Sequence, residues 1–321
     1  MNTPTIGRRF GRIEAGAIVL ALAALVSACK TMPEVGGAGS AGLGDVATAL
    51  SATGLTQRIP GANSNAVADM VQGASSVLKE YTAQEQRELG VQFSSVLLGA
   101  RPLLRHDAVQ RYVNQVGGWV AQHADSPVDA DGKPIAFAWR FGVIDTDAVN
   151  AYATPGGFVF VTVGLMRQLN SEAELAAVLA HEIAHVVRAH YIAAIRKGGF
   201  AQVLGGAVQM KAGSGALSTA MVNAVRNIYQ KGLDQSDEYE ADRLGLLYAA
   251  RAGYAPTGLP RVLKMYAANS QQDANYTLFF STHPAPSDRV ARLEPLLASK
   301  FAAVEGVVND GRYRAVRRQI K

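Results

Sequence analysis

The stretch "HEIAHVVRAH", residues 181–190, places three histidines and a glutamate among small apolar residues. His181 and His185 are four residues apart, so on a helix their side chains lie on one face, about one turn apart. Two imidazoles placed in this way can direct ring nitrogens at one metal ion. Glu182 completes the pattern H-E-x-x-H, in which the glutamate acts as a general base beside the metal. The stretch therefore predicts a reactive metal site; the alternative is a pair of incidental histidines on an exposed helix face.

The residues around this stretch predict one long helix. Ser171 and Glu174 form a capping-box pattern at its start, and a Gly-Gly pair at 198–199 supplies a stop. Buried histidines and a buried glutamate need polar partners, and a metal ion would provide them. The helix is expected to be buried because apolar side chains surround the motif, at Val178, Leu179, Ile183, Val186 and Val187.

His190, at the end of the stretch, lies nine residues after His181. On a continuous helix this spacing projects it to the opposite face. We therefore expect His190 to form a structural hydrogen bond and not to bind the metal.

A third ligand is predicted in "DEYEADRLG", residues 237–245. A catalytic zinc needs three protein ligands and one open position. Glu238 and Asp242 are four residues apart and share a helix face, so Glu238 can bind the metal while Asp242 accepts a hydrogen bond from the outer nitrogen of His181. Glu240 is expected to point away into solvent. The alternative for this segment is an ordinary charged helix face.

Hydrophobic periodicity predicts a mainly helical chain. Residues 82–98 and 107–124 carry apolar side chains at three- and four-residue spacing, which is typical of amphipathic helices. Residues 136–145 and 156–163 are rich in aromatic and β-branched side chains and predict strands. After residue 170 the pattern is helical almost throughout. The predicted fold is mainly α with a small β-sheet, in the α+β class.

The N-terminus has the pattern of a targeting segment. A basic start leads into an apolar run at 15–28, which is shorter than the ~20 residues of a membrane-spanning helix. The run ends at Cys29 and resembles a bacterial lipobox, in which the cysteine carries lipid; the alternative is a buried free thiol. We predict a lipoprotein signal peptide over 1–28, a flexible tether over 29–75, and a folded domain with a C-terminal helical tail over 76–321.

Composition narrows the classes of function. The net charge is +5, part of which comes from the basic start of the chain, and no basic patch is interleaved with aromatic residues, so no nucleic-acid partner is expected. Cys29 is the single cysteine, which excludes a disulfide within one chain.

Four stretches, in order, carry a family resemblance: "TAQEQRELG", "VNAYATPGGFVFVTVGLM", "HEIAHVVRAH" and "DEYEADRLG". Together they resemble the HtpX-like and CAAX-prenyl-endopeptidase-type zinc metallopeptidases, within the gluzincins, and most closely the lipid-anchored bacterial members. The resemblance covers roughly residues 80–300. It implies a zincin-type domain with one Zn²⁺ per chain, held by His181, His185 and Glu238, with Glu182 as the catalytic base.

Two further groups of residues gain candidate roles from this resemblance. "STHPAPSDR", residues 281–289, resembles a segment near the active site, so His283 and Arg289 are candidate catalytic residues that stabilise an oxyanion. Their alternative role is to tie down the C-terminal segment. The strand after the turn in "ATPGGFVF" is expected to edge the cleft and pair with extended substrate; the alternative is a core strand. The candidate substrate-binding residues are Asn150, Ala151, Tyr152, Gly156 and Gly157.

The expected function is zinc-dependent endopeptidase activity in the bacterial envelope, on misfolded or stalled envelope proteins. The alternative is a periplasmic chaperone or assembly factor with a latent or structural zinc site. We expect a periplasmic location with a membrane anchor through lipid on Cys29. No aspartate follows Cys29, which favours the outer membrane, and the outer-membrane assembly machinery is a candidate partner. Residues 198–225 are expected to form either a flap over the cleft or packed helix.

Overall fold

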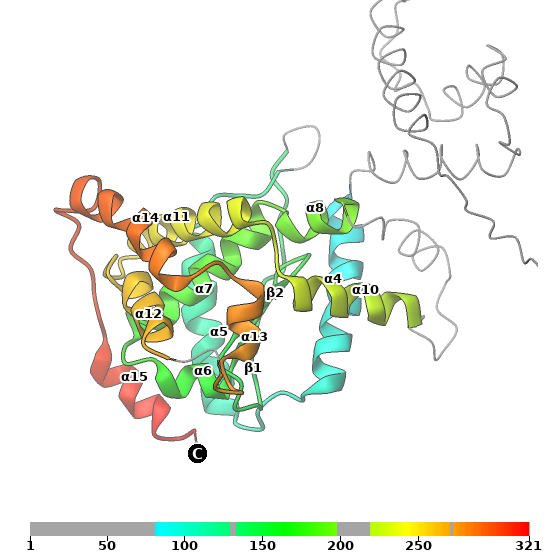
Figure 1. Ribbon diagram of the computed structural model, residues 1–321, viewed down its shortest axis with the longest axis horizontal. Helices are drawn as coiled ribbons and strands as arrows, with labels where there is room; N and C mark the ends of the chain where they lie inside the picture. The colour runs from blue at the N-terminus through cyan, green and yellow to red at the C-terminus, as the bar shows by residue number, and fades with distance from the viewer. Residues whose placement is uncertain (1–80, 129–132, 198–218, 270–271, 321) are drawn as a thin grey trace, which may run out of the picture. The chain divides into compact units, whose positions relative to one another are not determined.

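The computed structural model describes residues 81–128, 133–197, 219–269 and 272–320, which belong to one compact unit of the chain (Figure 1). The predicted signal peptide, Cys29 and tether lie outside the described residues, as do residues 198–218 of the predicted flap. No helix in the described part is long and apolar enough to cross a membrane. Helices dominate and one three-stranded sheet is present, which confirms the predicted fold class.

The first half contains the helices α4 (Ala83–Ala100), α5 (Asp107–Gln122), α6 (Val163–Gln168), α7 (Glu172–Val187) and α8 (His190–Lys197). Of these, α4 and α5 lie close to the predicted bounds of 82–98 and 107–124. The second half continues with α10 (Thr219–Lys231), α11 (Gln235–Arg251), α12 (Gly258–Ala267), α13 (Thr277–Thr282), α14 (Pro286–Ser299) and α15 (Asp310–Arg317).

The sheet has the order β1-β3-β2, with strands β1 (Arg140–Ile144), β2 (Ala151–Thr154) and β3 (Phe158–Thr162). β1 runs parallel to β3, and β2 runs antiparallel to it. The expectation that the strand after "ATPGG" edges the cleft is wrong, because that strand is β3, which is paired on both sides. The edge strand is β2. Gly156 and Gly157 form the turn between β2 and β3, with φ of 76° and 93°, which is the left-handed region that favours glycine.

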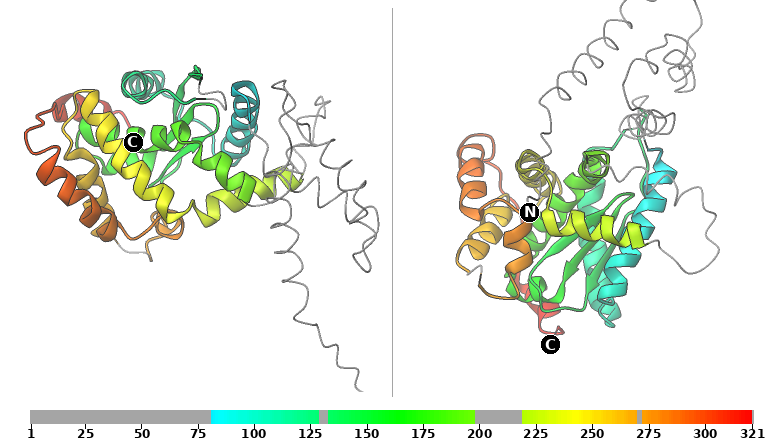
Figure 2. Two further views of the ribbon diagram at one scale, coloured as in Figure 1. Left: turned by 90° about the horizontal axis from the view of Figure 1, so that it is seen from above. Right: turned by 45° about the vertical axis from the view of Figure 1, so that its right-hand side comes forward.

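Helix α7 lies at the centre of the packing. Every residue from Glu172 to Val186 is buried, because α7 packs against the sheet, α5, α11 and α12 (Figures 1 and 2). The approach of α11 is close: a Cβ placed at Gly245 would lie 2.9 Å from the backbone nitrogen of His181. Small residues on both helices thus bring the H-E-x-x-H residues of α7 against the acidic residues of α11.

The predicted long helix is broken. α7 ends at Val187 and α8 begins at His190, and between them Ala189 adopts φ of 53°. At the start of α7 the Ser171 side chain accepts a hydrogen bond from the backbone of Glu174, at 3.2 Å. The Glu174 carboxylate bonds the backbone of Asn170 at 2.6 Å, one residue earlier than in a standard capping box.

Candidate metal centre

Three side chains converge on one point between α7 and α11. The Nε2 atoms of His181 and His185 are 3.0 Å apart. The Glu238 carboxylate lies 3.6 Å from His181 Nε2 and 3.4 Å from His185 Nε2. These three side chains are at most 6% exposed. The structure thus brings together the three residues that the sequence nominated as metal ligands.

The outer nitrogen of His181 faces Asp242, with Nδ1 3.0 Å from Oδ1. A carboxylate can only accept, so this contact places the proton of a neutral His181 on Nδ1. Arg289, which is 2% exposed, donates from Nε and Nη2 to the two Asp242 oxygens, at 2.8 and 2.6 Å. Asp242 therefore orients His181, and Arg289 orients Asp242.

His185 has a different outer partner. Its Nδ1 lies 2.9 Å from Nδ1 of His190, and Nε2 of His190 lies 3.3 Å from the Glu240 carboxylate. Glu240 also pairs with Arg188 at 2.9 Å, so the expectation that it points away into solvent is wrong. The contact between His190 and His185 was not predicted, because the sequence expectation assumed a continuous helix through Ala189.

The electrostatics of the site favour a cation. Burial lowers the pKa of His181, but its contacts with the carboxylates of Asp242 and Glu238 outweigh this and raise the pKa to about 9. Burial holds the pKa of His185 well below its usual value, against the attraction of Glu238. Burial alone would raise the pKa of Glu238, but attraction to His283 and His185 holds it well below its usual range. Glu238 as an ionised carboxylate and His185 as a neutral imidazole are thus in the states that metal ligands require, whereas His181 must release its Nε2 proton when a metal binds.

The donor set fits a metal ion. With the outer nitrogens of both histidines engaged, two Nε2 lone pairs and a carboxylate face one another. Within the described residues, Oε2 of Glu238 is buried and has no hydrogen-bond partner, a costly arrangement unless a cation or polar group satisfies it. Two imidazoles and one carboxylate form a common ligand set for zinc.

Glu182 follows His181 on α7 and is 4% exposed. Burial raises the pKa of its carboxyl to about 7, with His181 opposing this shift and Glu238 adding to it. A carboxyl with a pKa near neutrality can both accept and return a proton. The side chain is therefore suited to general acid–base chemistry beside the donor set.

His283 approaches the same point from the end of α13. Its Nε2 is 3.7 Å from Oε2 of Glu238, and its Nδ1 lies 3.2 Å from the carbonyl oxygen of Phe279. That carbonyl can only accept, and the Thr282 hydroxyl, 2.9 Å from Nδ1, donates its proton to the Leu278 carbonyl at 2.8 Å. Nδ1 therefore carries the proton, and the lone pair of Nε2 faces the centre. His181, Glu238 and His283 each place a ligand atom within 4.8 Å of the others, so His283 is a fourth potential ligand beside His185.

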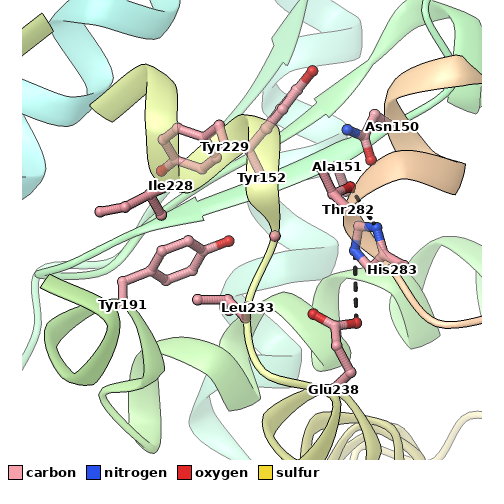
Figure 3. A pocket seen from close by; sticks show the side chains of 11 residues that line it. Asn150, Ala151, Tyr152, Tyr191, Ile228, Tyr229, Leu233, Glu238, Thr282 and His283 are labelled. Carbon is pink, nitrogen blue, oxygen red and sulfur yellow. Dashed lines mark hydrogen bonds and ion pairs between the residues drawn. The ribbon is translucent and has the colours of Figure 1, made fainter. Parts of the chain in front are cut away.

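A pocket opens beside the centre (Figure 3). Asn150, Ala151 and Tyr152 line it, together with Glu238 and His283. Its opposite side carries residues that the sequence did not single out, namely Tyr191, Ile228, Tyr229, Gly232 and Leu233.

The structure does not bring the two turn glycines to this pocket. A Cβ at Gly156 would lie 2.6 Å from the Cα of Arg87, and a Cβ at Gly157 would lie 3.0 Å from Cβ of Phe137. The turn therefore packs against the start of α4 and the segment before β1, with its two glycines four and five residues along the chain from Tyr152.

Comparison with known proteins places the chain among peptidases. It is 27% identical over 258 residues to the beta-barrel assembly-enhancing protease of Escherichia coli (strain K12), covering 77% of this chain and 50% of that protein. It is 32% identical over 163 residues to the mitochondrial metalloendopeptidase OMA1 of Schizosaccharomyces pombe, covering 50% of this chain and 47% of the relative. The chain spans about half the length of these curated relatives. The family model for peptidase family M48 matches residues 107–296, which contain the whole donor set, and the chain therefore belongs to peptidase family M48.

Proposed function

We propose that the protein is a zinc-dependent endopeptidase whose metal ligands are His181, His185 and Glu238. The observation that carries this proposal is the 3.0 Å approach of two histidine Nε2 atoms beside a buried carboxylate oxygen of Glu238 that has no hydrogen bond within the described residues. Membership of a peptidase family agrees with this chemistry. Zinc in such a site supplies a Lewis acid that polarises a peptide carbonyl and activates water.

The residues of this chain have distinct roles in the proposed reaction. Glu182 accepts a proton from the attacking water and returns it to the leaving amine. Asp242 and Arg289 keep His181 in the tautomer that presents its Nε2 lone pair. The sequence nominated Arg289 as an oxyanion donor, but Asp242 engages two of its three guanidinium nitrogens, so we assign it to orienting Asp242.

We infer that the substrates are extended segments of misfolded or stalled envelope proteins. β2 is an edge strand beside the pocket, and an edge strand can pair with an extended chain through main-chain hydrogen bonds. Such pairing depends little on side-chain identity, which suits unfolded substrates. The name of the E. coli relative, a beta-barrel assembly-enhancing protease, supports an envelope role with the outer-membrane assembly machinery as a candidate partner.

We also propose a lipoprotein organisation. It comprises a signal peptide over 1–28, lipid on Cys29, a tether over 29–75, and the zinc metallopeptidase domain over 76–321. The protein would then act in the periplasm, anchored to the outer membrane. The support is the pattern of the sequence around Cys29.

The test is Glu182→Gln in the full chain, with Glu294→Gln on the exposed face of α14 as a matched control. We expect Glu182→Gln to keep its zinc content, measured by metal analysis, and to lose cleavage of unfolded casein. The control should keep both. The amide is nearly isosteric with the carboxyl but cannot accept the proton, so casein cleavage at the wild-type rate by Glu182→Gln would remove the proposed mechanism.

A second candidate function is an assembly factor whose zinc site is closed at rest. The observation in its favour is the position of His283, whose Nε2 faces Glu238 at 3.7 Å. If His283 closes the site, His283→Ala should raise casein cleavage several-fold. If His283 instead stabilises an oxyanion, the same variant should cleave casein more slowly than wild type.

A further inference from the structure

The break between α7 and α8 has a specific geometric result. On a continuous helix, five residues at about 100° each would turn His190 roughly 140° away from His185. The left-handed conformation of Ala189, with φ of 53°, turns the chain back instead. The two Nδ1 atoms then lie 2.9 Å apart, and His190 is buried at 4% exposure. Unusual backbone conformations of this kind concentrate at functional sites.

The direction of the hydrogen bonds follows from the chemistry of the ligand. A metal-bound His185 presents the Nε2 lone pair, so its proton lies on Nδ1 and donates to Nδ1 of His190. The proton of His190 must then lie on Nε2, where it donates to the Glu240 carboxylate at 3.3 Å. Each ring therefore has one defined tautomer, and the chain of hydrogen bonds runs from His185 through His190 to Glu240.

We propose that His190 and Glu240 are positioning residues that fix the tautomer and ring orientation of His185 and raise its affinity for the metal. This inference rests on the proposed zinc site. In this arrangement Glu240 has the role for His185 that Asp242 has for His181. The difference is that His190 lies between Glu240 and His185, whereas Asp242 contacts His181 directly. Outer partners of this kind typically change metal affinity by about 10- to 100-fold.

The two chains of hydrogen bonds end in different surroundings. The chain from His181 ends at Arg289, which is 2% exposed. The chain from His185 ends at Glu240, whose side chain is 28% exposed and also pairs with the half-exposed Arg188 and Arg243. Glu240 is partly exposed, so its substitution tests the hydrogen bonds from His185 through His190 to Glu240 without opening a cavity beside the metal ligands.

The experiment separates the acceptor atom of His190 from its volume. His190→Asn keeps an acceptor near the position of Nδ1 but lacks the ring, whereas His190→Phe keeps a planar ring and lacks the acceptor. Zinc affinity of each full-length variant is measured by competition with a chromogenic chelator. His123→Asn is the matched control, at a partly buried histidine whose ring lies 4.4 Å from that of Trp119, away from the metal ligands.

We expect His190→Phe to bind zinc about 10- to 100-fold more weakly than wild type, and His190→Asn and the control to stay within about threefold. A loss in His190→Asn as large as that in His190→Phe would show that the acceptor atom is not what His190 supplies and would overturn the inference. Wild-type affinity in His190→Phe would overturn it as well. A wild-type protein that binds no zinc would overturn the proposed function itself, which is a distinguishable result.

Two variants at the partly exposed Glu240 test the same proposal without changing a buried side chain, in case the variants of the buried His190 fail to fold. Glu240→Ala removes the acceptor for His190 Nε2, and Glu240→Gln retains an oxygen acceptor. We expect zinc affinity to fall several-fold in Glu240→Ala and less in Glu240→Gln, while thermal unfolding of the metal-free variants matches wild type. Wild-type zinc affinity in Glu240→Ala would remove Glu240 from this chain of hydrogen bonds and contradict the proposal.

Discussion

Ala189 carries the most unusual backbone conformation near the centre. Its φ of 53° is in the left-handed region, where a residue with a Cβ costs roughly 1–2 kcal/mol relative to the right-handed conformation. Glycine has no such cost, although it loses more entropy on folding. The residue at 189 therefore influences how securely His190 is turned toward His185.

We predict that Ala189→Gly will raise the free energy of unfolding by up to about 1 kcal/mol and leave zinc affinity unchanged. Ala189→Val should lower the free energy of unfolding by about 2 kcal/mol, because a β-branched side chain fits this conformation poorly. Urea denaturation of the metal-free proteins measures both. A glycine variant as unstable as the valine variant would show that the turn does not depend on this conformation.

Sequence spacing predicts some contacts of the metal-site residues and not others. His181 and His185, and Glu238 and Asp242, are pairs at a spacing of four within single helices, so the sequence places each pair on one face. The contact between the two pairs follows from packing of α7 on α11, which spacing alone does not determine; it was inferred because a catalytic zinc needs a third protein ligand, and the family resemblance agreed. The contact of His190 with His185 could not be predicted, because Arg188 and Ala189 are residue types that favour a continuous helix and give no sign of the break.

At the scale of elements, α15 holds the start of α7. Glu172, the first residue of α7, is fully buried. Its carboxylate accepts hydrogen bonds from Tyr112 at 2.7 Å, Tyr254 at 2.9 Å and Asn309 at 3.1 Å, and it is paired with Arg312 of α15. Burial would raise the pKa of this carboxyl, but the hydrogen bonds, led by that of Arg312, outweigh it and lower the pKa below 4.5.

Glu172→Gln should therefore destabilise the protein in a pH-dependent way. A buried carboxylate with several donors contributes about 1–3 kcal/mol, and the amide leaves donors unpaired. Because the folded pKa lies below the unfolded value of 4.5, the charge stabilises the protein above pH 4.5 and loses this effect as the pH falls through the folded pKa. The stability gap between wild type and variant, from urea unfolding, should narrow below pH 4.5.

The control for this prediction is Glu305→Gln, an exposed glutamate that precedes α15. It should follow the wild-type curve at every pH. A gap between wild type and Glu172→Gln that stays constant from pH 7 to pH 3 would show that the charge of Glu172 is not what stabilises the contact.

The sequence predicted the helices that have clear hydrophobic periodicity, but it did not predict strand β2 or the order of the strands in the sheet. α4 and α5 match the expected helices because their apolar positions repeat at helical spacing. β2 is four residues long, with a partly exposed first half, and such a short segment has no distinct pattern. The strand order β1-β3-β2 depends on which strands pair in space, and the sequence expectation therefore assigned the edge to β3.

At the scale of the whole molecule, the family model covers residues 107–296. The contacts of Arg312 and Tyr313 with α7 and α6 lie beyond that range and still join the same unit. The match confirms the family that the four sequence motifs indicated. It carries no information on residues 1–80, so the proposals for the signal peptide, Cys29 and the tether need a test of their own.

Cys29→Ala provides that test. The apolar run at 15–28 is shorter than a spanning helix of ~20 residues, so after signal cleavage the proposed anchor is lipid on Cys29. One acyl chain binds a membrane only marginally, and stable attachment needs two or more. In cells, we expect wild type to fractionate with membranes and to carry added lipid mass, and Cys29→Ala to lack both.

Because the predicted tether separates Cys29 from the domain, both proteins should cleave casein equally in detergent. Identical fractionation, with no lipid mass on either protein, would reduce the localisation to that of a secreted protein without an anchor and leave the zinc chemistry of α7 and α11 untouched.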